Sequence, residues 1–144
     1  MDGIMEIIAV ILGEIIEAEM GGPTFLYLGP SDAGMYSDTV PVAVFNDLAV
    51  QVRVRRSPVQ PPDQFVLQMR ISVDEETVRR GEIVFANRVE ADPNFPNRLI
   101  TEHVNISLQD LVFPRFGLYQ LNFAVDGGPE HWVDYAVAFD EDDG

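Results

Sequence analysis

Apolar and polar residues alternate with a period of two over most of the chain after residue 47, which predicts β-strands with one buried face. In Leu48–Arg55 the valines share one face, and Arg53 and Arg55 share the other. Phe65–Val73 and Ile100–Leu108 alternate in the same way. Because each segment has a single apolar face, the pattern favours antiparallel sheets with one side in water.

The last third of the chain carries the most specific local pattern. A strand up to Val125 and a strand His131–Phe139 flank an Asp-Gly-Gly turn. Gly117 and Tyr119 stand at the entry to this penultimate strand, where immunoglobulin-like sandwiches carry a tyrosine corner, a phenol bonded to backbone just upstream. Antibody domains place a cysteine two positions later, but Leu121 stands there. We therefore predict an all-β, antiparallel, immunoglobulin-like β-sandwich of about eight strands, held by packing alone.

The first part of the chain fits two interpretations. Ile4–Met20 fits an amphipathic helix, because its acidic residues cluster on one side at 100° per residue. It also fits two strands, Met5–Leu12 and Ile15–Met20, because isoleucine and valine dominate and a glycine separates them. We favour strands, since the Gly-Gly-Pro sequence at 21–23 and the apolar run after it predict a hairpin.

Three connections separate the predicted strands. Residues 57–63 are rich in proline, which lacks an amide donor, so they form a loop. Residues 74–81 form a charged connection that ends in glycine and leads into a short strand, Glu82–Arg88. Residues 91–97, with two prolines, form a second rigid loop. The length of 144 residues fits one domain, which we place at residues 1–139, followed by an acidic tail at 140–144.

The two terminal hairpins resemble those of an uncharacterised bacterial family of small β-sandwich proteins, a domain of unknown function. Its members combine an N-terminal hairpin, with a Gly-Gly turn before a strand ending in Leu-Gly, and a C-terminal hairpin of the form F-P-x-x-G-x-Y, apolar strand, D-G. Here these elements are Ala9–Gly29 and Phe113–Gly127, with Ala49–Arg55 between them. The resemblance implies a β-sandwich and supplies no catalytic residue.

Charge is strongly divided along the chain. Residues 1–50 carry eight acids and no base, residues 51–100 eight arginines and seven acids, and residues 101–144 nine acids and Arg115, which gives the net charge of −15. This acidity argues against binding to nucleic acid or to anionic membranes, both of which need cationic surfaces. The N-terminus has no positive region and no uninterrupted apolar run, so we expect neither a signal peptide nor a membrane span. Together with the absence of cysteine, this predicts a cytoplasmic protein.

Few residues could support catalysis or bind a metal. His103 and His131 are the only histidines, and neither lies in a metal-binding motif. Acidic residues at Asp32, Asp38 and Asp92 lack the spacing of a calcium loop and are better explained by turns. The glycines at 127 and 128 close a hairpin rather than hold a phosphate. We predict no catalytic residue, no cofactor and no metal site.

The arginines suggest how the protein could associate. Arg53, Arg55 and Arg56, with Arg70 from another strand, are candidates for one positive stripe on an outer sheet face, which could pair with the acidic ends of the same or another copy of the chain. The simpler interpretation is that they neutralise carboxylates within the domain. We predict a non-enzymatic β-sandwich that binds protein. Two alternatives are an acidic decoy of a nucleic acid, such as a phage would encode, and a virion or assembly component.

Overall fold

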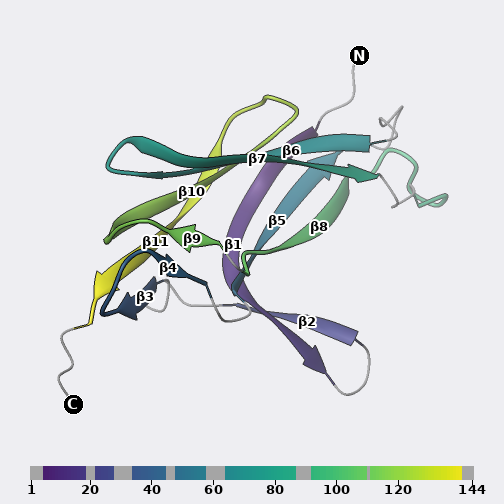
Figure 1. Ribbon diagram of the computed structural model, residues 1–144. Helices are drawn as coiled ribbons and strands as arrows, with labels where there is room; N and C mark the ends of the chain where they lie inside the picture. Colours follow the sequence, from purple (N-terminus) through teal and green to yellow (C-terminus); the bar gives the residue numbers. More distant parts are fainter. Residues whose placement is uncertain are drawn as a thin grey trace.

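The computed structural model describes residues 5–18, 22–27, 34–44, 48–57, 64–86, 92–109 and 111–140. The described residues form strands and turns, and none of them is helical (Figure 1). The strands are, in chain order, β1 (Met5–Ala18), β2 (Gly22–Tyr27), β3 (Gly34–Ser37), β4 (Val42–Ala43), β5 (Leu48–Arg56), β6 (Gln64–Val73), β7 (Glu76–Ala86), β8 (Ile100–Ser107), β9 (Val112–Phe113), β10 (Gly117–Val125) and β11 (His131–Phe139).

Two larger sheets share one hydrophobic core. The four-stranded sheet has the order β2-β1-β5-β8 and is antiparallel throughout. The five-stranded sheet has the order β3-β11-β10-β6-β7 and is antiparallel except that β3 joins β11 in parallel. Figure 1 shows β6 and β7 crossing in front of β1, β5 and β8. Strand β1 contacts β10 and β11, and the inner faces of both sheets supply the core cluster.

The predicted alternation is confirmed in the described strands. Val50, Val52 and Val54 of β5 are fully buried, and buried and exposed residues alternate without interruption along β8. Strand β11 begins and ends at the predicted residues, His131 and Phe139. The period of two was therefore sufficient to find β5, β8 and β11.

The helical interpretation of the N-terminal segment is wrong over residues 5–18. These residues form one continuous strand, not two, because β1 pairs with β5 over its first ten residues and with β2 over its last six. A bulge between Ile7 and Ala9 absorbs a register shift. The choice between helix and strand was decided by partners distant in sequence, which the local pattern does not contain.

The prediction that residues 74–81 form a charged connection is also wrong. Strand β7 already begins at Glu76, and only Asp74 and Glu75 form the turn, with φ of 50° and 66°. Two positive φ values are typical of the tight turns that join antiparallel strands, where Asn-Gly or Asp-Gly is the usual sequence. Because Asp-Glu lacks that signature, the hairpin was not recognisable from the sequence.

The predicted tyrosine-corner hydrogen bond is present at the start of β10. The Tyr119 hydroxyl donates to the carbonyl oxygen of Arg115 at 2.7 Å and accepts the Arg115 amide at 3.2 Å. Gly117 has φ of 155°, and a Cβ there would lie 2.8 Å from Val73 Cγ2, so the corner requires glycine. The Tyr119 ring is fully buried and meets Phe113 edge to face at 4.6 Å.

Tyr135 of β11 packs in the same aromatic group. Its ring stacks on Phe113 at 5.5 Å, and only 2% of the residue is exposed. Burial raises the pKa of the Tyr135 phenol, and the negative charge of Glu14 on β1 adds to the rise.

Candidate interaction surface

The four arginines predicted to form one stripe do not all lie on one surface. Arg53 and Arg55 lie on the outer face of the four-stranded sheet, opposite in direction to the valines of β5. Arg55 forms an ion pair with Glu6 of β1, and Arg53 Nε donates to Gln51 Oε1 at 2.9 Å. Arg70 lies on the five-stranded sheet. The predicted stripe is therefore wrong.

Arg56 faces the interior. It lies an even number of positions along the strand from the buried valines of β5, so it points to their side of the strand, and it is 2% exposed. Its Nη2 lies 3.3 Å from Oε1 of Glu102, which faces inward from β8 and whose side chain is 9% exposed. Arg56 therefore pairs with a carboxylate inside the domain. This agrees with the simpler interpretation, in which the arginines neutralise carboxylates of the same domain.

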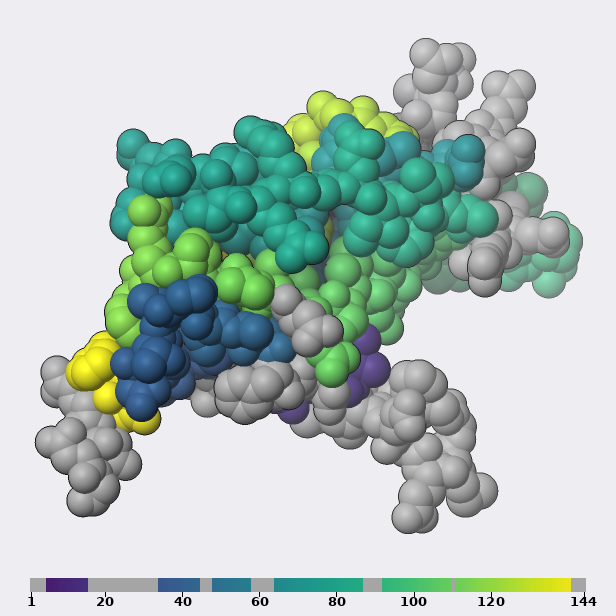
Figure 2. Space-filling view, viewed as in Figure 1, coloured from purple at the N-terminus to yellow at the C-terminus, as the bar shows by residue number. Residues whose placement is uncertain are grey.

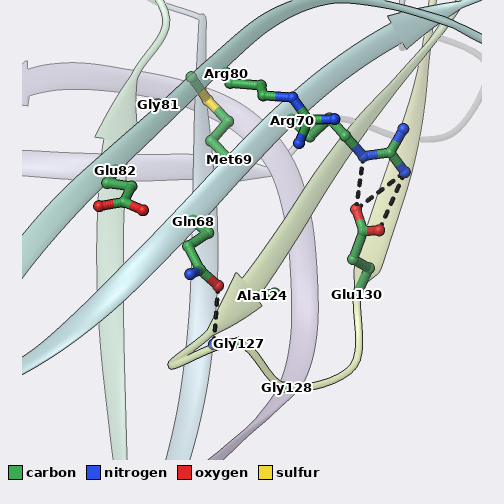
Figure 3. A pocket seen from close by; sticks show the side chains of 10 residues that line it. All are labelled: Gln68, Met69, Arg70, Arg80, Gly81, Glu82, Ala124, Gly127, Gly128 and Glu130. Carbon is green, nitrogen blue, oxygen red and sulfur yellow. Dashed lines mark hydrogen bonds and ion pairs between the residues drawn. The ribbon is translucent and has the colours of Figure 1, made fainter.

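Arg70 stands at a hollow in the outer face of the five-stranded sheet, here called the Arg70 hollow. It has a volume of about 470 Å³. Arg70 Nε and Nη2 each lie 3.1 Å from a different carboxylate oxygen of Glu130, so the pair is bidentate (Figure 3). The side chain of Arg70 is 30% exposed and that of Glu130 is 42% exposed, which leaves this ion pair open to solvent and to a ligand.

Arg80 places a second cation in the Arg70 hollow. It is the register partner of Arg70 across the β6–β7 pair, and Figure 3 shows the two side chains next to each other. Like charges directly opposite on neighbouring strands repel, and Glu130 supplies one negative charge for the two guanidinium groups. No hydrogen bond or ion pair of the Arg80 side chain joins it to another described residue. Glu82 lines the hollow beyond Gly81, so the end formed by Arg70 and Arg80 retains an excess positive charge.

A hydrogen-bonded hairpin turn forms one rim of the Arg70 hollow. Asp126 and Gly127 have φ of 48° and 77°, and the Asp126 carboxylate accepts the Val66 amide at 2.9 Å. The Gly127 amide donates to Gln68 Oε1, also at 2.9 Å. This bond fixes the carboxamide of Gln68, so its NH₂ group remains as a donor at the hollow.

An exposed tryptophan belongs to the same row of side chains. Trp132, Asn122, Arg70 and Arg80 are register partners on four adjacent strands. Asn122 is 2% exposed and donates to the carbonyl oxygen of Arg70 at 3.2 Å, whereas Trp132 is 55% exposed. Arginine and exposed aromatic side chains are the residues enriched at protein interfaces.

The sequence pattern alone does not place Arg80, Glu130 and Trp132 in one site. Arg80 lay in the segment assigned to a connection, and its partnership with Arg70 depends on the unrecognised turn at residues 74–75. An exposed tryptophan at the start of a strand was the one available signal.

The described residues offer little for metal chemistry. His103 lies on the outer face of β8, and His131 begins β11 in the other sheet. No group of three or more potential metal ligands occurs among the residues described. The Asp92 carboxylate accepts the Asn94 amide at 2.8 Å, as a turn residue does, whereas Asp32 lies outside the described residues. In those same segments, no helix is long and apolar enough to cross a membrane.

The chain is an all-β protein with an arginine-bearing hollow on one sheet face. No protein-family model matches it, and a search of curated proteins found no significant match. The resemblance to an uncharacterised sandwich family stays a prediction.

Proposed function

We propose that the chain is a non-enzymatic, immunoglobulin-like binding module that engages a protein partner through the outer face of its five-stranded sheet. The strand order supports this fold assignment. Strands β1-β5-β8 occupy the places of A, B and E in such domains, and β11-β10-β6-β7 those of G, F, C and C′. The tyrosine corner at the entry to β10 stands where strand F carries it.

The observation that carries the functional proposal is the row formed by Trp132, Arg70 and Arg80 beside the Arg70 hollow. A carboxylate entering the hollow would find the Arg80 guanidinium and the Gln68 amide as donors. Guanidinium groups bind carboxylates with two parallel hydrogen bonds, which supply orientation as well as energy. An apolar group next to that carboxylate would cover the exposed ring of Trp132. The partner therefore presents an acidic side chain flanked by apolar residues.

The distribution of carboxylates favours a binding module over an acidic decoy. A decoy needs carboxylates in rows, with the spacing of a phosphate backbone. In the described segments the acidic residues are spread over both sheets and their turns, and Glu6, Glu76, Glu102 and Glu130 pair with arginines of the domain. Those four carboxylates are therefore already paired with arginines of the same domain.

Nuclear magnetic resonance mapping tests the proposal. The probe is N-acetyl-Leu-Glu-Leu-amide, and the matched control is the same peptide with glutamine. The side-chain Nε signals of Arg70 and Arg80 and the indole signal of Trp132 should shift with the glutamate peptide, while those of Arg53 and Arg55 on the other sheet stay still. Equal shifts with both peptides, or shifts centred on Arg53 and Arg55, would refute this assignment.

A further inference from the structure

The edges of the two sheets differ in how they are protected against pairing with another strand. Natural proteins protect exposed sheet edges with β-bulges, prolines, charged side chains that point inward, or very short edge strands. On the five-stranded sheet, the edge strand β3 has only four residues. The other edge strand, β7, has a bulge near Val78. It also carries an exposed arginine, Arg79, opposite the buried Ile71 of β6. On the four-stranded sheet, β2 contains Pro23. Strand β8 has eight residues, no proline and no bulge, and its one inward-facing charge, Glu102, forms an ion pair with Arg56.

The backbone of β8 has a free side that can be assigned residue by residue. The Leu108 amide donates to the Leu48 carbonyl oxygen at 2.8 Å. In an antiparallel pair the residues that bond to the neighbour alternate with those that do not, so the even-numbered residues of β8 bond to β5. The amides and carbonyls of Thr101, His103, Asn105 and Ser107 consequently point away from β5. In the part of the chain that the structure describes, β5 is the only strand paired with β8.

The core is less completely covered beside this edge. Ile100, Val104 and Ile106 of β8 are 8–9% exposed, whereas the valines of β5 are at 0%. A hollow of about 480 Å³ lies between β7 and β8, lined by Phe65, Phe85 and Val84 together with residues 101–105. Figure 2 shows β7 (teal) and β8 (green) adjoining on one face of the molecule. A strand added next to β8 would cover these apolar side chains.

We propose that the strand added there is β8 of a second copy of this chain, paired antiparallel across a twofold axis at Val104. In this register Thr101 lies opposite Ser107 of the second copy, and His103 lies opposite its Asn105, so every free backbone group of β8 finds a partner. The facing side chains are small or neutral, so no like charges meet across the axis. Glu102 would be the one inward charge at the edge, and Arg56 forms an ion pair with it.

The charge of the chain sets the sign of the salt dependence. Each copy carries −15, so two copies repel at long range, and salt screens that repulsion. Dimers formed through the β8 edge should therefore strengthen as salt is added. An association between arginines and acidic segments would weaken instead, which separates the two models.

Sedimentation velocity and amide hydrogen exchange on the full chain test the proposal. From about 10 μM to about 1 mM, the dimer fraction should rise with concentration by mass action, and rise further at higher salt. The amides of Thr101, His103, Asn105 and Ser107 should exchange roughly tenfold more slowly in the dimer, while those of Val104 and Ile106 are slow throughout. A chain that stays monomeric under all conditions would overturn the proposal, as would a dimer in which these four amides still exchange freely.

His103→Pro and His103→Ala form the matched pair of variants. Proline removes an edge amide that β5 does not use and is tolerated on edge strands, so His103→Pro should be monomeric. His103→Ala keeps the amide and should dimerise like the unmodified chain. If His103→Pro does not fold, Ser107→Pro takes its place at the end of the strand. A dimer that survives folded proline variants lies on another surface.

Discussion

Two ion pairs of the same chemistry have different consequences in this domain. Arg56–Glu102 joins β5 to β8 inside the core, with 2% and 9% of the side chains exposed. Arg70–Glu130 lies on the outer face of the five-stranded sheet, with 30% and 42% exposed. The buried pair is out of reach of a partner and matters for folding. The open pair gains little stability from water-screened attraction, and its side chains remain accessible from solvent.

The largest effect should come from breaking the buried pair. Glu102→Gln removes the negative charge that lies beside Arg56 in the core, and we expect a loss of about 3–5 kcal/mol in the free energy of unfolding, measured by urea denaturation. The double variant Arg56→Met/Glu102→Leu, which removes both charges, should recover most of that loss. A loss below about 1 kcal/mol for Glu102→Gln would mean that water reaches the pair.

An intermediate effect is expected from the buried hydroxyl of Tyr119. Tyr119→Phe leaves both the carbonyl and the amide of Arg115 without this partner, at a cost of about 1–3 kcal/mol. The matched control is Tyr36→Phe, which removes the hydroxyl of an exposed tyrosine and should not change stability. Equal stability of Tyr119→Phe and the unmodified chain would show that the corner does not hold β10.

A smaller effect should appear only at alkaline pH. Burial raises the pKa of Tyr135, so the folded chain holds this proton more tightly than the unfolded chain does. Its contribution to stability is complete below the ordinary tyrosine pKa of about 10 and is lost as pH rises beyond it. Denaturant unfolding between neutral and strongly alkaline pH should show a shallower decline for Tyr135→Phe. Parallel curves would contradict a buried, protonated Tyr135.

The smallest effect on stability should come from the open pair. Glu130→Gln should change the free energy of unfolding by about 0–1 kcal/mol, measured under the same conditions as Glu102→Gln. A cost similar to that of the buried pair would make Arg70–Glu130 a structural element and remove the contrast between the two pairs.

The sequence was informative wherever one strand face is buried and the other is wet. Alternation located β5, β8 and β11, and a local motif located the bond of Tyr119. The same alternation places Arg56 with the valines, and applying it there would have removed Arg56 from the stripe. The position of Arg80 opposite Arg70 could not be predicted, because it depends on the register of β6 against β7. That register is set by the turn at Asp74 and Glu75, whose sequence is unusual for a hairpin. The site combines residues distant in sequence, such as Arg70 and Glu130, and pairing between strands is not a local property.

Binding of a carboxylate in the Arg70 hollow can be tested on two adjacent arginines of β7. Arg79 and Arg80 are both exposed, but only Arg80 lines the hollow. Trp132, the only tryptophan, reports binding of N-acetyl-Leu-Glu-Leu-amide through its fluorescence. Arg80→Ala should weaken binding roughly tenfold or more, as expected for a lost charged hydrogen bond, whereas Arg79→Ala, with the same change in net charge, should bind like the unmodified chain. Equal weakening by both substitutions would reduce the effect to net charge and contradict carboxylate binding in the Arg70 hollow.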